Sequence, residues 1–155
     1  MEEKIMTLLE TIRIIENVAI AQPSVKTIIE NDVFKLNEHP EAKYGVFAFV
    51  QGQHGGSVDS DLFTYRFSFF YVDRLRHDRS NQIEVQSVGI ETINNIMQRL
   101  SDLGIESGSY TIQPFNHRFA DECAGVFCTV DLETIRGSSC GIEFEKKTGN
   151  EFIIS

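Results

Sequence analysis

The residues most suggestive of catalysis are Gly137-Ser138-Ser139-Cys140-Gly141, which match G-x-S-x-G, the pattern of a serine nucleophile elbow. His54-Gly55-Gly56 has some likeness to an oxyanion loop. A nucleophile elbow needs a helix after its serine, and an acid and a histidine must follow in the chain. Here Ile142–Glu145 alternates as a strand does, and no histidine follows Ser139. The sequence therefore predicts a turn at 137–141, with no catalytic residues.

Three cysteines and several histidines raise the question of a metal site. Cys123, Cys128 and Cys140 with His117 lack the close pairs that structural zinc uses. His39-Pro40-Glu41 matches the H-x-E of zinc deaminases, but the P-C-x-x-C that should accompany it is missing. Neither G-x-x-x-x-G-K-[ST] nor G-x-G-x-x-G, the glycine-rich motifs that bind phosphate groups, occurs in the sequence. We expect free thiols, of which Cys128 lies on the inward side of its strand, and neither a metal nor a cofactor.

Two other groups of residues have the composition of contact surfaces. Arg74, Arg76 and Arg79 lie close together in an acidic chain. The planar guanidinium of arginine suits ion pairs between subunits, whereas the alternative is a strand-to-helix junction whose arginines pair with nearby carboxylates. The polar loop over 52–60 is expected to be mobile and to contact an assembly partner. Its candidate interface residues are Gly52, Gln53, His54, Gly55, Gly56 and Ser57.

The spacing of apolar residues predicts the elements that hold these groups in place. The N-terminal helix, over 1–22, has an apolar stripe that includes Leu9, a polar side that includes Glu10, and an end set by Pro23. Short strands are expected between 24 and 42, one of them at Val33–Leu36. A long hairpin over 45–73 follows, because 45–51 is apolar on both faces and 61–73 alternates. One face of its second strand is aromatic: Phe63, Tyr65, Phe67, Phe69 and Tyr71.

The main helix is predicted over 81–103. Asn81 and Glu84 form a capping-box pattern at its start, and Gly104 stands where a helix end favours positive φ. Two strands within 109–136, at Tyr110–Phe115 and Val126–Ile135, and a terminal hairpin over 141–155 follow. Residues 1–155 are thus expected to form one α+β domain, in which a mixed or antiparallel sheet packs on both helices. The apolar stripe of the main helix consists of Val85, Val88, Ile93, Ile96, Met97, Leu100 and Leu103.

Composition narrows the classes of function. The 155 residues have a formal net charge of −9, and their 41% hydrophobic and 24% charged residues are ordinary for a globular domain. The negative charge argues against a protein that grips nucleic-acid phosphates, and it suits a surface past which DNA slides. No apolar run approaches about 18 residues, and Met1-Glu2-Glu3 has the wrong charge for a signal peptide. We therefore expect a soluble protein made in the cytosol, with no membrane partner.

The stretch KYGVFAFVQ, a glycine-rich loop, an aromatic strand ending in FYVDRLRHDRSN and the helix EVQSVGIETINNIMQRL resemble small virion proteins of Bacteroidales phages, including crAss-like phages. Over about residues 1–136, the order of elements is also similar to that of the tail-terminator and tail-completion proteins of tailed phages. Those proteins cap the tail tube or join it to the neck as a ring. The resemblance implies a tail-terminator-like fold without catalytic residues.

The function implied by this resemblance is a structural component of the virion, at the head–tail neck or the tail end. The implied partners are further copies of the chain in a homo-oligomeric ring and the adjacent tail-tube, portal or neck proteins. DNA would pass through the ring without being specifically bound. Such a protein is made in the cytoplasm of the bacterial host and located in the virion.

Two other functions are open at this point. A small acidic binding or regulatory module that docks a basic protein predicts that carboxylates gather on one face. A small-ligand-binding domain predicts a deep pocket with converging polar groups. A ring protein predicts a discrete large oligomer.

Overall fold

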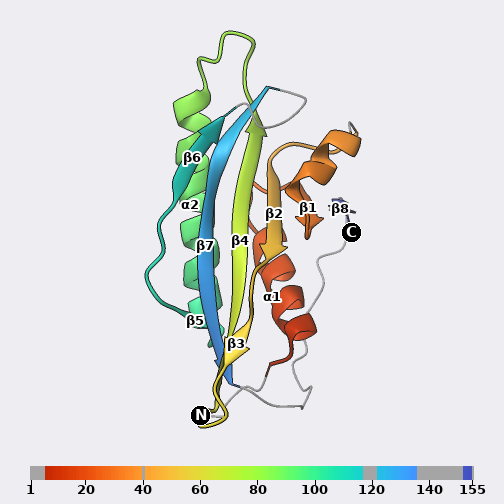
Figure 1. The fold of residues 1–155 in the computed structure, drawn as a ribbon. Coiled ribbons are helices and arrows are strands. Elements are labelled where there is room, and N and C mark those ends of the chain that lie inside the picture. The colour runs from red at the N-terminus through yellow and green to blue at the C-terminus, as the bar shows by residue number, and fades with distance from the viewer. Residues whose placement is uncertain (1–5, 40, 117–121, 136–151, 155) are drawn as a thin grey trace.

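The computed structural model describes residues 6–39, 41–116, 122–135 and 152–154. The strands in this part of the chain form one eight-stranded sheet in the order β5-β7-β4-β2-β1-β8, with β3 paired to β4 and β6 paired to β7. Two helices, α1 (Leu8–Ile20) and α2 (Gln82–Asp102), lie against the same face of this sheet (Figure 1). The predicted α+β class with a mixed sheet is confirmed.

Two strands of 13 residues each form the centre of the sheet. They are β4 (Leu62–Arg74) and β7 (Cys123–Ile135), which pair antiparallel along their whole length. The other edge of β4 pairs antiparallel with β2 (Val46–Gln51), so the two strands of the predicted long hairpin do pair. As predicted, β2 is buried on both faces, since Phe47 and Phe49 join one core cluster and Val46 and Ala48 join another.

Shorter strands complete the sheet. β1 (Thr27–Glu30) runs parallel to β2, and β8 (Phe152–Ile154) runs parallel to β1. The partner expected for β8 in a terminal hairpin falls at 142–145, outside the described residues. The short strands paired to β4 or β7 are β3 (Gly55–Gly56), β5 (Glu106–Ser107) and β6 (Gln113–Asn116).

The aromatic face of β4 forms the larger core together with α2, as predicted. Phe67 and Phe69 are fully buried, and they share a cluster with Ile93, Ile96 and Leu100 of the helix. Each fully buried side chain of this size contributes about 1.5–3 kcal/mol through the hydrophobic effect. This packing anchors α2 to the two longest strands.

The predicted stripe of α2 is wrong at Val88, whose side chain is 39% exposed. Gly89 and Thr92 of the helix are buried instead. A Cβ atom at Gly89 would lie 2.7 Å from Cγ2 of Val126 and 2.9 Å from Cδ1 of Tyr71. The absence of a side chain at Gly89 therefore lets the helix approach the sheet closely, and this rotates Val88 outward.

The predicted stripe of α1 is rotated as well. Leu9 is 61% exposed, whereas Glu10 is buried. A capping box explains the inward position of Glu10: the Thr7 side chain accepts from the Glu10 N–H at 3.2 Å, and Glu10 Oε2 accepts from the Thr7 N–H at 3.4 Å. Ile15 and Ala19 are buried as predicted, and the helix ends at Ile20, before Pro23.

Three other local predictions need correction. Val33–Leu36 is not a strand, because the Asp32 carboxylate accepts from the Phe34 N–H at 2.9 Å and starts the 3₁₀ helix η1 (Val33–Glu38). Asn81 forms no side-chain cap, although α2 begins after it. Tyr110 precedes the strand β6, and its hydroxyl donates to Asn94 Oδ1 at 2.6 Å. At the other end of α2, Gly104 has the predicted positive φ, 88°.

Candidate functional site

The two groups predicted as contact surfaces lie at opposite ends of β4 (Figure 1). The loop over 52–60 precedes the strand, and the segment with the three arginines overlaps its end and leads into α2. At about 3.3 Å per residue, the ten steps along β4 from Thr64, which pairs with Gly55, to Arg74 separate the two groups by roughly 33 Å. Because β4 is paired with β7 over its whole length, this separation is fixed by the sheet.

The first half of the loop is held against β4, which corrects the expectation that the whole loop is mobile. Gly55 pairs with Thr64 and Gly56 pairs with Phe63, so these residues form the short strand β3. The Gly52 N–H also donates to the Arg66 carbonyl at 2.7 Å. The predicted interface residues Gln53 and Ser57 flank this strand and are exposed.

His54 fastens the loop through both ring nitrogens. Nδ1 accepts from the Arg66 backbone N–H at 3.2 Å, and Nε2 lies 3.0 Å from Gln51 Oε1. Since a backbone N–H can only donate, Nδ1 carries no proton and Nε2 donates to the amide oxygen. The ring also contacts Tyr65 and Phe67, with centroids 5.3 and 5.8 Å away. His54 therefore positions the loop.

Beside the loop, Arg66 and Asp131 form a bidentate ion pair between β4 and β7. Arg66 Nε donates to Oδ1 at 2.7 Å, and Nη2 donates to Oδ2 at 3.1 Å. The hydrogen bonds from Arg66, followed by its charge, hold the pKa of Asp131 below its usual value. Asp131 was not among the predicted site residues, because only the register of two strands that are distant in sequence brings it opposite Arg66.

The three arginines have different surroundings. The Arg74 guanidinium lies 4.7 Å from the centroid of the Tyr44 ring, and the Arg79 guanidinium donates to Glu122 Oε1 at 3.3 Å. Arg76 is exposed, and its backbone N–H donates to Asn81 Oδ1 at 2.7 Å. The pairing of Arg79 matches the alternative of a junction with local ion pairs, and the charge of Arg76 contributes to lowering the pKa of Asp78 after the hydrogen bonds from Ser80.

The thiols have no metal-binding geometry in the described part of the chain, where no three His, Cys, Asp or Glu side chains gather around a common point. Cys123 and Cys128 are buried thiols, and Cys123 Sγ donates to the Tyr44 hydroxyl at 3.6 Å. Burial raises the pKa of the Cys128 thiol to about 12, so this group stays a neutral, apolar side chain. The serine motif at 137–141, Cys140 and His117 lie outside the described residues.

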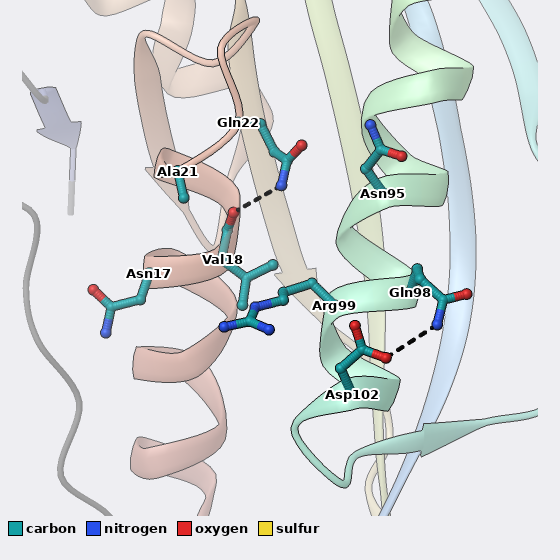
Figure 2. Close-up of a pocket in the computed structure, with 8 residues that line it drawn as sticks. All are labelled: Asn17, Val18, Ala21, Gln22, Asn95, Gln98, Arg99 and Asp102. Carbon is teal, nitrogen blue, oxygen red and sulfur yellow. Dashed lines mark hydrogen bonds between the residues drawn. The ribbon is translucent and has the colours of Figure 1, made fainter.

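A polar groove separates the two helices (Figure 2). The Arg99 side chain reaches across from α2 toward Val18 of α1, and Gln98 Nε2 donates to Asp102 Oδ1 at 3.2 Å. This groove encloses about 420 Å³ and is open to the surface along its length. It brings polar groups together but is not the deep pocket that a small-ligand-binding domain predicts. Its full lining is Asn17, Val18, Ala21, Gln22, Asn95, Gln98, Arg99 and Asp102.

No protein-family model matches the chain, and no curated protein matches it. Neither helix of the described part is long and apolar enough to cross a membrane. The function is therefore argued from the geometry and chemistry of the two ends of the sheet.

Proposed function

We propose that this chain is a structural component of a tailed-phage virion. It serves as one subunit of a homo-oligomeric ring at the head–tail neck or tail end, through which DNA passes. The observation that carries the proposal is the fixed separation of two unlike contact surfaces by the β4–β7 ladder. A ring subunit that contacts both a neighbouring subunit and an adjoining protein needs two different surfaces, held in a constant relation.

The chemistry of the two ends supports this role. The loop is fastened at Gly52–Gly56 and presents exposed polar residues, which suits a contact with an adjoining tail-tube, portal or neck protein. The exposed Arg76 at the other end suits an ion pair with a neighbouring subunit. A net charge of −9 keeps passing DNA from adhering to the wall of the ring.

The test is to locate the chain in particles. Antibodies against the purified chain should label the neck or tail end of virions of the phage that encodes it, and mass spectrometry of purified virions should detect the chain. The absence of the chain from purified virions, together with its presence in the lysate, would overturn the proposal.

A second candidate function is an acidic module that docks a basic protein. It is favoured by the pairing of Glu106 with Glu133, two exposed carboxylates that stand directly opposite each other on β5 and β7. Affinity capture of a basic host or phage protein that is not a virion component would support this function over the ring.

A further inference from the structure

We infer that His54 is a pH-dependent latch on the loop over 52–57: it holds the loop against β4 while its imidazole is neutral, and it releases the loop when the imidazole is protonated. This loop is the surface proposed to contact an adjoining tail-tube, portal or neck protein, so the consequence for assembly rests on the proposed function. The latch itself belongs to the single chain and is testable without a partner.

The hydrogen bonds of His54 require a neutral ring. Nδ1 accepts from the Arg66 backbone N–H at 3.2 Å, and Nε2 donates to Gln51 Oε1 at 3.0 Å. A protonated imidazole carries an N–H on both nitrogens and has no acceptor left. Protonation therefore preserves the contact with Gln51 but sets two N–H groups against each other at Arg66, and the hydrogen bond between the ring and β4 is lost.

The backbone contacts of the loop are few in the described part of the chain. The strand β3 pairs with β4 through two residues, and the Gly52 N–H donates to the Arg66 carbonyl at 2.7 Å. Both residues of β3 are glycines, which lose more conformational freedom on ordering than any other residue. The loss of one hydrogen bond at His54 is therefore enough to shift the balance between a fastened and a released loop.

The charged groups around His54 keep their charge where a histidine titrates. The groove between the loop and the sheet is also lined by Arg66 and Asp131, and the hydrogen bonds from Arg66 hold the pKa of Asp131 below its usual value. The Tyr65 ring lies 5.3 Å from the imidazole, and burial, followed by the charge of Glu10, raises the pKa of its hydroxyl. Among the residues that line this groove, His54 is thus the one whose side chain changes charge between about pH 5 and 8.

Release of the latch changes the surface that a partner meets. In the fastened state, the exposed residues Gln53 and Ser57 stand at fixed positions beside this groove of about 560 Å³. A released loop must be ordered again when a partner binds, and this ordering lowers the affinity. A contact made through the loop should therefore be tighter at neutral pH than at mildly acidic pH.

The experiment is NMR spectroscopy of the full chain, labelled with nitrogen-15, at about pH 5 and about pH 8. The imidazole nitrogen shifts should identify Nδ1 of His54 as the unprotonated nitrogen at the higher pH. Hydrogen exchange at the Arg66 amide, corrected for the pH dependence of the exchange chemistry, should be about tenfold more protected at the higher pH, as one hydrogen bond provides. The other amides of the β4–β7 ladder should be equally protected at both pH values.

Two variants separate the latch from other effects of pH. His54→Ala removes the acceptor, so protection at Arg66 should be low at both pH values. His77→Ala is the matched control, because His77 is an exposed histidine in the segment after β4, at the opposite end of that strand. The pH dependence at Arg66 should persist in this control.

The inference is overturned if protection at Arg66 in the unmodified chain is the same at both pH values, if His54→Ala retains the difference, or if His77→Ala abolishes it. Loss of protection along the whole β4–β7 ladder at the lower pH would also overturn it, because that pattern is global destabilisation. A chain that is present in virions but has no latch refutes the inference alone. A working latch in a chain that is absent from virions refutes the proposed function alone.

Discussion

Replacing Ile96 with alanine tests whether α2 is fastened to the sheet as described. Ile96 is fully buried in the core cluster that includes Phe67 and Phe69. Ile96→Ala removes three buried carbon groups, worth about 0.8 kcal/mol each in transfer free energy, or about 2.4 kcal/mol together. The cavity left behind raises the expected loss of unfolding free energy to as much as about 5 kcal/mol.

Val88→Ala on the same helix is the matched comparison, because the sequence pattern treats both positions alike and the structure does not. At 39% exposure, Val88 loses about 1 kcal/mol of burial on truncation, and the higher helix propensity of alanine offsets about half of that loss. Denaturant titration followed by circular dichroism measures both values. A loss below about 0.5 kcal/mol for Ile96→Ala, or equal losses for the two variants, would refute the packing of α2 described above.

Three further predictions concern titration, salt and the loop. Burial raises the pKa of the Cys128 thiol from 9.0 to about 12, so its contribution to the free energy of unfolding should be fully present below about pH 9 and should be lost as the pH rises toward 12. Cys128→Ala should flatten this decline in denaturant titrations across that pH range. Equal slopes for the variant and the unmodified chain would contradict the assignment. The ion pair of Arg66 with Asp131 is half-exposed, so Arg66→Ala should lower the melting temperature slightly at low salt and not at about 1 M salt. A decrease in melting temperature that persists at high salt would indicate that Arg66 acts through packing. His54→Ala should speed hydrogen exchange at the Arg66 amide and leave the other amides of the β4–β7 ladder protected, and an unchanged rate at Arg66 would argue against the His54 contact.

Local sequence patterns predicted the helices and strands in which burial repeats at regular intervals along the chain. Aromatic residues occupy every second position from Phe63 to Tyr71, so a strand with one buried aromatic face follows from this spacing. Val33–Leu36 has strand-like composition as well, but the Asp32 side chain supplies a hydrogen bond that stabilises a 3₁₀ turn instead. Composition does not distinguish these two outcomes, because the deciding interaction is a single contact.

The candidate site was predictable only where a local sequence pattern marks its residues. The arginines stand out from sequence because they are concentrated in an acidic chain. The ion pair of Arg66 with Asp131 and the opposition of Glu106 to Glu133 depend on strand register, which no local pattern encodes. The fastening of the loop was missed because His54 receives its hydrogen bond from the backbone of a neighbouring strand.

The central ladder also imposes an order on folding. Arg66 and Asp131 are 65 residues apart in the chain, so β7 leaves the ribosome long after β4. Until then the long edge of β4 lacks its main partner, and α2 is the element made in between that can cover the aromatic face. Sheets that depend on such distant pairings fold in milliseconds to seconds, and an unpaired aromatic strand is prone to aggregate during that time. The early synthesis of α2 therefore shields the nascent strand while the chain waits for β7.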